Sequence, residues 1–455
     1  MKPIINFFKA KWLLLLSFVL LWFISCEKDP KFPEGEGKGG NDYGHLLQTK
    51  TFSGSVVIKW LDTQLDMLRV PLAAGTGSQD AARALAYCGI VTYESVVPGM
   101  PAYQSLTNQL NQFPGMPSTE PGKAYHWAAS ANAALADMNR KLFPTTSDAN
   151  KFKIDSLENA LKDIYAGETD DPTLQRSIAF GKEVAKRVYE WATTDGSANV
   201  NPPYVPLVGP GLWESTPPNF PAAVNPYASQ RRLMTPGVAD GTALEPPPPY
   251  SIDPASSFYA MVKDVYDKSQ QLTPEQTAMA LYHRDAPGYP GGGHFVAILS
   301  QVLSKAAPTL DVAALAYAKT GIASYDALAI CFTIKYSVNL VRPITYIQNV
   351  LHYTTWSALF NTPGHPEFPS AHAVNAAAIA GMWTDLFGKD FQFTLHSYDY
   401  IGLPPRSYNS FDDMAKEMAD SRVFAGIHYQ PSVDKGRWLG EKVTQNILGK
   451  LKFHK

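Results

Sequence analysis

Apolar residues recur at helical spacing along most of this chain. The clearest stripe runs through residues 56–69 and consists of Val57, Trp60, Leu61, Leu65 and Leu68. Similar spacing predicts helices at 81–97, 126–142, 155–164, 174–194, 254–268, 274–281, 295–306, 311–341, 344–352, 372–387, 411–427 and 433–451. No segment alternates apolar and polar residues as a half-buried strand does. Helices in this number, without strands, predict an all-α fold built from helical bundles.

The totals exclude some classes of function. A formal net charge of −2 offers no basic surface, so no nucleic-acid partner is expected. The hydrophobic fraction of 45% is that of an ordinary globular protein. Many of the 36 prolines cluster in 201–250, which predicts a long connection with little regular structure.

The N-terminus has the pattern of an export signal. Three lysines precede an apolar run at 12–24, which is short for a membrane span of about 20 residues. Ser25-Cys26 after it resembles a bacterial lipoprotein cleavage site, with an uncleaved anchor as the alternative. We therefore expect a signal peptide at 1–26, lipidation of Cys26, a flexible tether at 27–45 and a helical domain at 46–455, with its site in 254–455. The protein would be exported and anchored to the outer membrane through the lipid alone.

Three short polar clusters lie in the last third of the chain. They read Lys335-x6-Arg342-Pro343, Pro369-Ser370-Ala371-His372 and Ser421-Arg422-x5-His428. Together they supply three cations, a hydroxyl and two imidazoles. The planar fork of an arginine matches a tetrahedral oxyanion in bidentate fashion. The inventory therefore suits phosphate or vanadate, with one histidine to bond the central atom and the other to move protons.

The helix pattern also suggests how the clusters are oriented. Lys335 and Arg342 are seven residues apart and would share a face if one helix continued through both. Pro343 must then break that helix or begin the next. Ser370 is a plausible N-cap, which would turn free backbone N–H groups and a positive dipole end toward an anion. Gly426 is expected to mark a local break before His428.

The clusters resemble the active-site pattern that vanadium-dependent haloperoxidases share with type-2 phosphatidic acid phosphatases. The pattern is Lys-x6-Arg-Pro, Pro-Ser-Gly-His and Ser-Arg-x5-His, and this chain departs from it once, with Ala371 for glycine. Further stretches over roughly 50–450 favour the bacterial haloperoxidase branch: Arg83-Ala84-Leu85-Ala86, Pro287-Gly288, Gly293-His294-Phe295 and the run Thr362–Phe368. The resemblance implies two stacked helical bundles, of which the second carries the site.

By this resemblance, the cofactor is vanadate bound to His428. Lys335, Arg342 and Arg422 would neutralise its oxygens, and the Ser370 hydroxyl and Ala371 backbone N–H would complete the cradle. His372 would act as the acid–base group, and Lys335 would polarise bound peroxide. The reaction would take hydrogen peroxide and halide to hypohalous acid, from which a small organic molecule could accept the halogen.

Two neighbouring residues are expected to form a halide pocket. His365 stands where relatives carry Phe or His, and we expect it to be polar and hydrated, which favours iodide or bromide over chloride. Phe332, where relatives often have Trp, would line the same pocket. Relatives also often have Asp four residues after the metal-bound histidine, where this chain has Ser432. Glu367 is expected to tie its loop to an arginine.

Two other functions remain open at this stage. An acid phosphatase would bind phosphate in the same cradle and form a phosphohistidine at His428, with His372 protonating the leaving alcohol. A divergent surface lipoprotein would use the pocket only to bind an anion. The three clusters do not separate these functions, because vanadate mimics the phosphoryl transition state.

Overall fold

The computed structural model describes residues 47–69, 78–285, 288–289 and 292–455, which fall within one compact unit. The expected signal peptide 1–26, its Cys26 and the tether 27–45 lie outside the described residues, as does Pro287.

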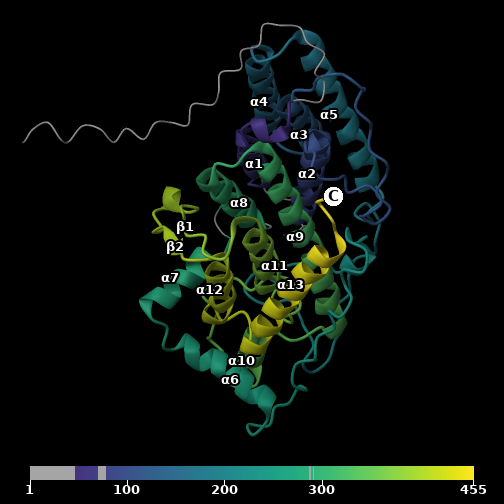
Figure 1. Cartoon of the computed structure of the whole chain (residues 1–455). Coiled ribbons are helices and arrows are strands. Elements are labelled where there is room, and N and C mark those ends of the chain that lie inside the picture. The colour runs from purple at the N-terminus through teal and green to yellow at the C-terminus, as the bar shows by residue number, and fades with distance from the viewer. Residues whose placement is uncertain (1–46, 70–77, 286–287, 290–291) are drawn as a thin grey trace, which may run out of the picture. The chain divides into compact units, whose positions relative to one another are not determined.

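The first five helices pack against one another (Figure 1). They are α1 (Ser55–Leu68), α2 (Ser78–Val96), α3 (Trp127–Leu142), α4 (Asp148–Ala166) and α5 (Asp171–Ala192). Ser147 caps α4 and Asp170 caps α5, each accepting a backbone N–H of the first turn. Helix α3 lies between α2 and α5, so the apolar faces of these helices close a common core.

A long connection follows, with η3 (Ala228–Gln230) as its short helical element, as its prolines predict. The chain then forms α6 (Ser257–Ser269), α7 (Pro274–Tyr282) and α8 (Gly293–Ala306). Thr273 begins α7 with a capping box, in which its side chain and that of Gln276 satisfy each other's backbone N–H.

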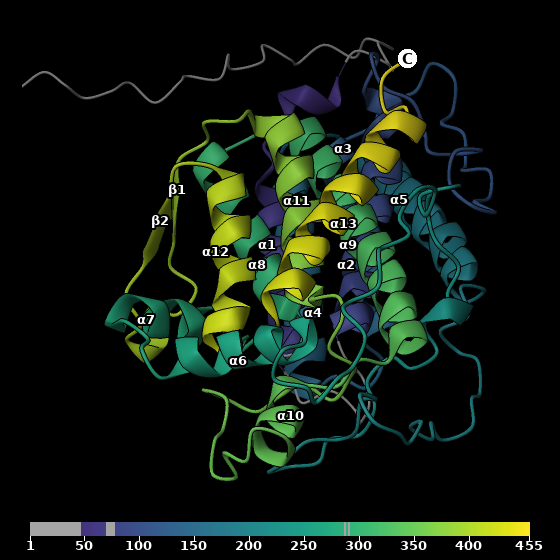
Figure 2. The same cartoon turned by 90° about the horizontal axis from the view of Figure 1, so that it is seen from below.

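The last helices form a second group around α9. They are α9 (Leu310–Val338), α10 (Pro343–Asn349), α11 (Ala371–Phe387), α12 (Phe411–Phe424) and α13 (Gln430–Lys450). Helix α9 packs against α2 of the first group and against α11 and α13 of its own, and these lie side by side in Figure 2. Because α9 is covered on both sides, it is apolar around its circumference and buried along most of its length. The prediction of an all-α fold is confirmed.

Three local predictions were wrong. A short hairpin pairs β1 (Phe393–Leu395) with β2 (Arg406–Tyr408), and strands of three residues are too short to show alternation. Helix α4 begins at Asp148 rather than 155, because Ser147 supplies the cap. Helix α9 ends at Val338 because Asn339 takes a left-handed φ of 53°. None of the described helices combines the length and apolarity that crossing a membrane requires.

Candidate active site

The predicted site residues sit at the ends of four helices and converge on one loop. Lys335 lies in the last turn of α9, Arg342 is the N-cap of α10 and Ser370 is the N-cap of α11. Arg422 occupies the last turn of α12, and His428 follows in the short connection to α13. All five are buried, although most carry charge or hydrogen-bonding groups.

Lys335 and Arg342 come together through a turn, not along a helix face. Helix α9 has ended before Arg342, so the two side chains do not share a helix as the seven-residue spacing allowed. Pro343 instead starts α10, where its missing N–H costs nothing. Both side chains reach the loop before α11: Lys335 Nζ donates to Pro366 O and Glu367 O, each at 2.9 Å. Burial lowers the pKa of Lys335 to about 7, and Arg342 adds to the effect.

Arg342 is held by acceptors of the protein itself. Its Nε donates to His365 O at 2.9 Å and its Nη1 to Ile427 O at 2.8 Å. The same Nη1 lies 3.3 Å from His428 Nε2. No carboxylate among the described residues hydrogen-bonds this guanidinium, and burial lowers its pKa to about 10. Glu367 opposes that shift electrostatically, so Arg342 brings positive charge to His428 without a hydrogen-bonded carboxylate of its own.

Arg422 and Ser370 carry donors that no described residue satisfies. Arg422 Nη1 donates to His283 O and the guanidinium lies over the Phe360 ring, but its Nε is buried without a partner in the described structure. Burial lowers its pKa to about 10. Ser370 Oγ is likewise buried and unpartnered, since this N-cap makes no side-chain bond to its helix. Such orphaned donors are costly unless a ligand takes them up.

Ala371 fits its place without strain. It is the first residue of α11 and is helical, a conformation that alanine adopts as easily as glycine. The N-terminus of α11 points its first backbone N–H groups at the same region as Ser370. The single departure from the family pattern thus removes no donor.

His428 is held by a carboxylate that was not predicted to contact it. Its Nδ1 lies 2.8 Å from Glu367 Oε1, and Glu367 also accepts from Tyr429 N at 2.9 Å and Ser432 Oγ at 2.5 Å. Glu367 was expected to meet an arginine, but its side-chain hydrogen bonds go to these three donors instead. Burial, Arg342 and Lys335 hold the pKa of His428 far below its ordinary value. A neutral His428 that donates from Nδ1 leaves Nε2 unprotonated, with Arg342 Nη1 as its neighbour.

His372 lies in the first turn of α11 and is held by a second unpredicted carboxylate. Its Nε2 lies 2.8 Å from Asp285 Oδ2, and 22% of its side chain is exposed. Burial and Arg422 lower the pKa of His372, whereas Asp285 raises it. Asp285 stands alone after α7, and its 87-residue separation from His372 gives no sequence signal.

The two predicted halide-pocket residues are in contact. The rings of Phe332 and His365 pack edge to face with centroids 5.1 Å apart. His365 Nδ1 lies 2.9 Å from Arg342 Nη2, and the residue is only 8% exposed. The expectation of a hydrated His365 is therefore wrong, because the loop 363–367 folds it against Arg342. Burial, Lys335 and Arg342 depress its pKa well below the ordinary value.

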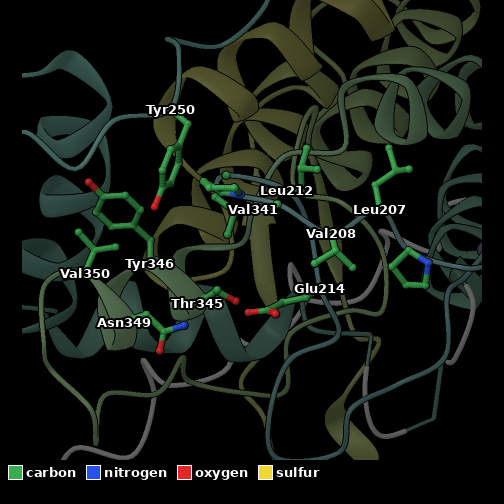
Figure 3. Close-up of a pocket in the computed structure, with 14 residues that line it drawn as sticks. Leu207, Val208, Leu212, Glu214, Tyr250, Val341, Thr345, Tyr346, Asn349 and Val350 are labelled. Atoms are coloured by element: carbon green, nitrogen blue, oxygen red, sulfur yellow. The ribbon is translucent and has the colours of Figure 1, made fainter.

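A separate pocket is lined by the long connection, Val341 and residues of α10 (Figure 3). It has a volume of about 320 Å³, and Tyr250, Tyr346, Glu214 and Val341 are among its lining residues. None of the predicted site residues lines it. The described residues also hold no group of three or more His, Cys, Asp or Glu side chains suited to a metal cation. The converging cluster of an imidazole nitrogen and several cations suits an oxyanion instead.

Comparison with known proteins shows what this chain is similar to. A family model described as the VCPO second helical-bundle domain matches residues 315–454, which contain every predicted site residue except Cys26. A bacterial vanadium-dependent iodoperoxidase structure is 27% identical, with a TM-score of 0.79, over 89% of this chain and 98% of its own. The chain is thus similar to vanadium haloperoxidases in its second helical group and in its overall fold.

Two less similar structures share the fold of this chain. A bacterial vanadium-dependent chloroperoxidase in its apo form has a TM-score of 0.62 at 15% identity, covering 84% of this chain and 96% of its own. The holo form of such a chloroperoxidase has a TM-score of 0.58 at 17% identity, with coverage of 84% and 94%. Among curated proteins, none matches the chain significantly. The structures that this chain resembles are therefore vanadium-dependent haloperoxidases, and the chain shares their fold.

Proposed function

We propose that this protein oxidises iodide or bromide with hydrogen peroxide, using vanadate held by His428, and releases hypohalous acid. The observation that carries the proposal is the set of buried cations around the unprotonated Nε2 of His428. Lys335, Arg342 and Arg422 lack a hydrogen-bonded carboxylate within the described structure, so a multiply charged oxyanion would supply the missing negative charge. The similarity to an iodoperoxidase over nearly that protein's whole length supports the choice of halide.

The residues present fit vanadate. His428 would bond through Nε2, and the unpartnered Arg422 Nε and Ser370 Oγ would donate to its oxygens. Lys335 Nζ has one N–H left after its two bonds to main-chain carbonyls. Bound vanadate supplies a Lewis-acid centre that activates hydrogen peroxide toward attack by halide.

His372 would manage the protons of this reaction. Hydrogen peroxide, a halide ion and one proton give hypohalous acid and water, so the site must deliver a proton to the departing oxygen. Asp285 accepts from His372 Nε2, which leaves Nδ1 as the nitrogen that exchanges protons. Burial and Arg422 lower the pKa of His372 and Asp285 opposes them, so the neutral imidazole is favoured and its Nδ1 can accept a proton and pass it on.

Reconstitution tests the proposal directly. The chain without its first 26 residues is loaded with orthovanadate and assayed for halogenation with iodide, bromide and chloride. Activity that requires both vanadate and peroxide is expected with iodide and bromide, with negligible activity on chloride. His428→Ala should lose bound vanadium, because it removes the bonding nitrogen. Halogenation by vanadate-free protein, or full vanadium content in His428→Ala, would refute the proposal.

An acid phosphatase is the second candidate, and the Glu367–His428 pair is the observation that favours it. A carboxylate that accepts from Nδ1 strengthens Nε2 as a nucleophile toward phosphorus. Assay of the same preparation on a chromogenic phosphate ester separates the two. Ester hydrolysis without vanadate, together with no halide oxidation, would favour the phosphatase.

We also propose that the protein is exported and anchored by lipid on Cys26. The support is the basic and apolar N-terminal pattern that ends at Ser25-Cys26. Wild-type protein should partition with membranes and Cys26→Ser should not. Wild-type protein found wholly in the aqueous fraction would refute the anchor.

A further inference from the structure

We propose that Glu367 is a positioning residue for His428: with Ser432, it fixes the imidazole tautomer whose unprotonated Nε2 faces the anion cradle. The inference deepens the proposed function, on which it rests for the identity of the anion. It concerns a residue that touches the histidine and not the reacting atoms.

The hydrogen-bond partners of the Glu367 carboxylate determine which nitrogen of His428 carries the proton. The side chain is fully buried and meets three groups: the imidazole, the backbone N–H of Tyr429 and the hydroxyl of Ser432. The Tyr429 N–H can only donate, and it shares Oε1 with the imidazole. An ionised carboxylate can only accept, and to that form His428 presents Nδ1–H. The proton is thereby kept off Nε2, the nitrogen nearest Arg342.

The main chain at Glu367 is held on both sides, so the carboxylate has little freedom to withdraw. Its N–H donates to Leu340 O at 3.0 Å, and its carbonyl accepts from Lys335 Nζ at 2.9 Å. A predicted cation of the cradle therefore also fixes the loop that orients the histidine. The same loop thus positions both the cradle cation Lys335 and His428.

Ser432 is the natural partner of a glutamate at position 367. It lies four residues after His428, in the first turn of α13, where the family resemblance led us to look for Asp. An Asp there would bring a second carboxylate against Glu367, and two buried like charges in contact are unfavourable. Serine instead donates to Glu367, and its carbonyl accepts from Ser370 N at 3.0 Å. The carboxylate for His428 thus comes from the loop before α11 rather than from α13.

The test removes the carboxylate at position 367 and, in one variant, places a carboxylate at position 432. Full-length Glu367→Met keeps the bulk and removes the acceptor, and Glu367→Gln keeps one acceptor oxygen. In the double variant Glu367→Met/Ser432→Asp, the carboxylate stands at position 432. Imidazole ¹⁵N chemical shifts of His428 report the tautomer without any ligand, and calorimetry with orthovanadate and with inorganic phosphate reports the cradle.

Wild type should show a protonated Nδ1 and an unprotonated Nε2. Glu367→Met should lose this pattern and bind orthovanadate about 10–100-fold more weakly, as is usual when the partner of a metal-bound histidine is removed. Glu367→Gln and the double variant should each restore the tautomer and part of the affinity. Ser432→Ala, a milder change, should lose less in the same direction, and it keeps the test usable if Glu367→Met does not fold.

Glu94→Met is the matched control. Glu94 is equally buried and accepts from Leu106 N at 2.7 Å and Ser105 Oγ at 2.8 Å, but it contacts none of the cradle residues. It should leave the His428 shifts and orthovanadate affinity unchanged. A folded Glu367→Met with wild-type shifts and affinity within twofold would overturn the inference, as would wild type with a protonated Nε2. If wild type binds no orthovanadate but shows the expected tautomer, the proposed cofactor fails and the positioning role stands.

Discussion

Arg83 in the first helical group and Arg422 in the second are both largely withdrawn from water, but their charges are treated differently. Arg83 Nε meets Asp195 Oδ2 at 2.5 Å, and Tyr87 donates to the same oxygen. Although burial opposes it, Asp195 raises the pKa of Arg83, and Arg83 in turn lowers that of Asp195. Arg422 has a main-chain carbonyl where Arg83 has a carboxylate, and its pKa falls to about 10.

This contrast separates a structural cation from one kept available for a ligand. A buried ion pair completed within the protein needs nothing further, whereas an uncompensated cation lowers stability until an anion arrives. Lys335 and Arg342 share the second condition, since both donate to carbonyls. The region around α9 to α13 therefore contains buried cations without hydrogen-bonded carboxylates, whereas Arg83 in the first group has one.

The largest expected effect comes from breaking the completed pair. Arg83→Ala should lower the free energy of unfolding by about 3–5 kcal/mol, because it leaves Asp195 charged and buried. Denaturant unfolding followed by circular dichroism measures the change. Orthovanadate affinity of the folded variant should stay at the wild-type level. A loss under about 1 kcal/mol would mean that Tyr87 and the Ser197 N–H suffice for Asp195.

The next effect is a pH dependence of the anion-free protein. The pKa of Lys335 falls from 10.5 to about 7 in the fold, so between these values the unfolded chain binds a proton that the native protein does not. Stability should therefore rise by a few kcal/mol as pH increases from about 7 toward 10.5. Lys335→Met should flatten this slope, as measured by unfolding at several pH values. An identical slope in wild type and Lys335→Met would show that Lys335 is charged in the apo site.

Removing Arg422, which has no hydrogen-bonded carboxylate, should have the opposite effect on stability. Arg422→Met removes a buried cation that no carboxylate pairs, so the free energy of unfolding should be unchanged or higher. Orthovanadate binding should weaken by about 1.5–3 kcal/mol, the scale of a charge-assisted hydrogen bond. Thermal unfolding with and without orthovanadate reads both quantities in one series. If Arg422→Met proved as unstable as Arg83→Ala, the contrast between the two regions would fail.

The sequence predicts the helices and the site residues better than it predicts their partners. The spacing of apolar residues and the capping residues suffice to predict α1, α3, α7 and α11, because both signals are local in the sequence. The end of α9 at Val338 depends on Asn339 in a left-handed turn, which the apolar run through Val341 conceals. Lys335 and Arg342 bind main-chain carbonyls, which every residue carries, so no residue type signals those contacts.

The carboxylates that orient the two histidines illustrate the same limit. Glu367 is 61 residues from His428, and Asp285 is 87 residues from His372. Each comes from a loop whose path is set by tertiary packing, and neither falls at a recurring distance from the clusters. One usable signal existed: Ser432 in the place expected for Asp meant that the acceptor for His428 had to come from elsewhere.

The smallest expected effect concerns His365, which lies between the cradle and the halide pocket. His365→Phe should weaken orthovanadate by only about 0.5–1.5 kcal/mol, because Arg342 loses the Nδ1 acceptor but keeps the carbonyls of His365 and Ile427. The new ring would extend the apolar wall that Phe332 begins. Halide preference should therefore shift, measured as the ratio of iodide to bromide oxidation at saturating vanadate.

His352→Phe is a suitable control for this change, since His352 is exposed and outside the site, and it should alter neither quantity. If His365→Phe loses vanadate as completely as His428→Ala, then His365 is the main support of Arg342. If it changes neither affinity nor halide ratio, the 2.9 Å contact with Arg342 is energetically silent and Phe332 alone shapes the pocket. If His365 serves both the anion cradle and the halide pocket, His365→Phe should lose part of the orthovanadate affinity and also change the iodide-to-bromide ratio. The neutral imidazole accepts from Arg342 on one side and meets Phe332 on the other. One ring therefore affects both orthovanadate binding and the shape of the halide pocket.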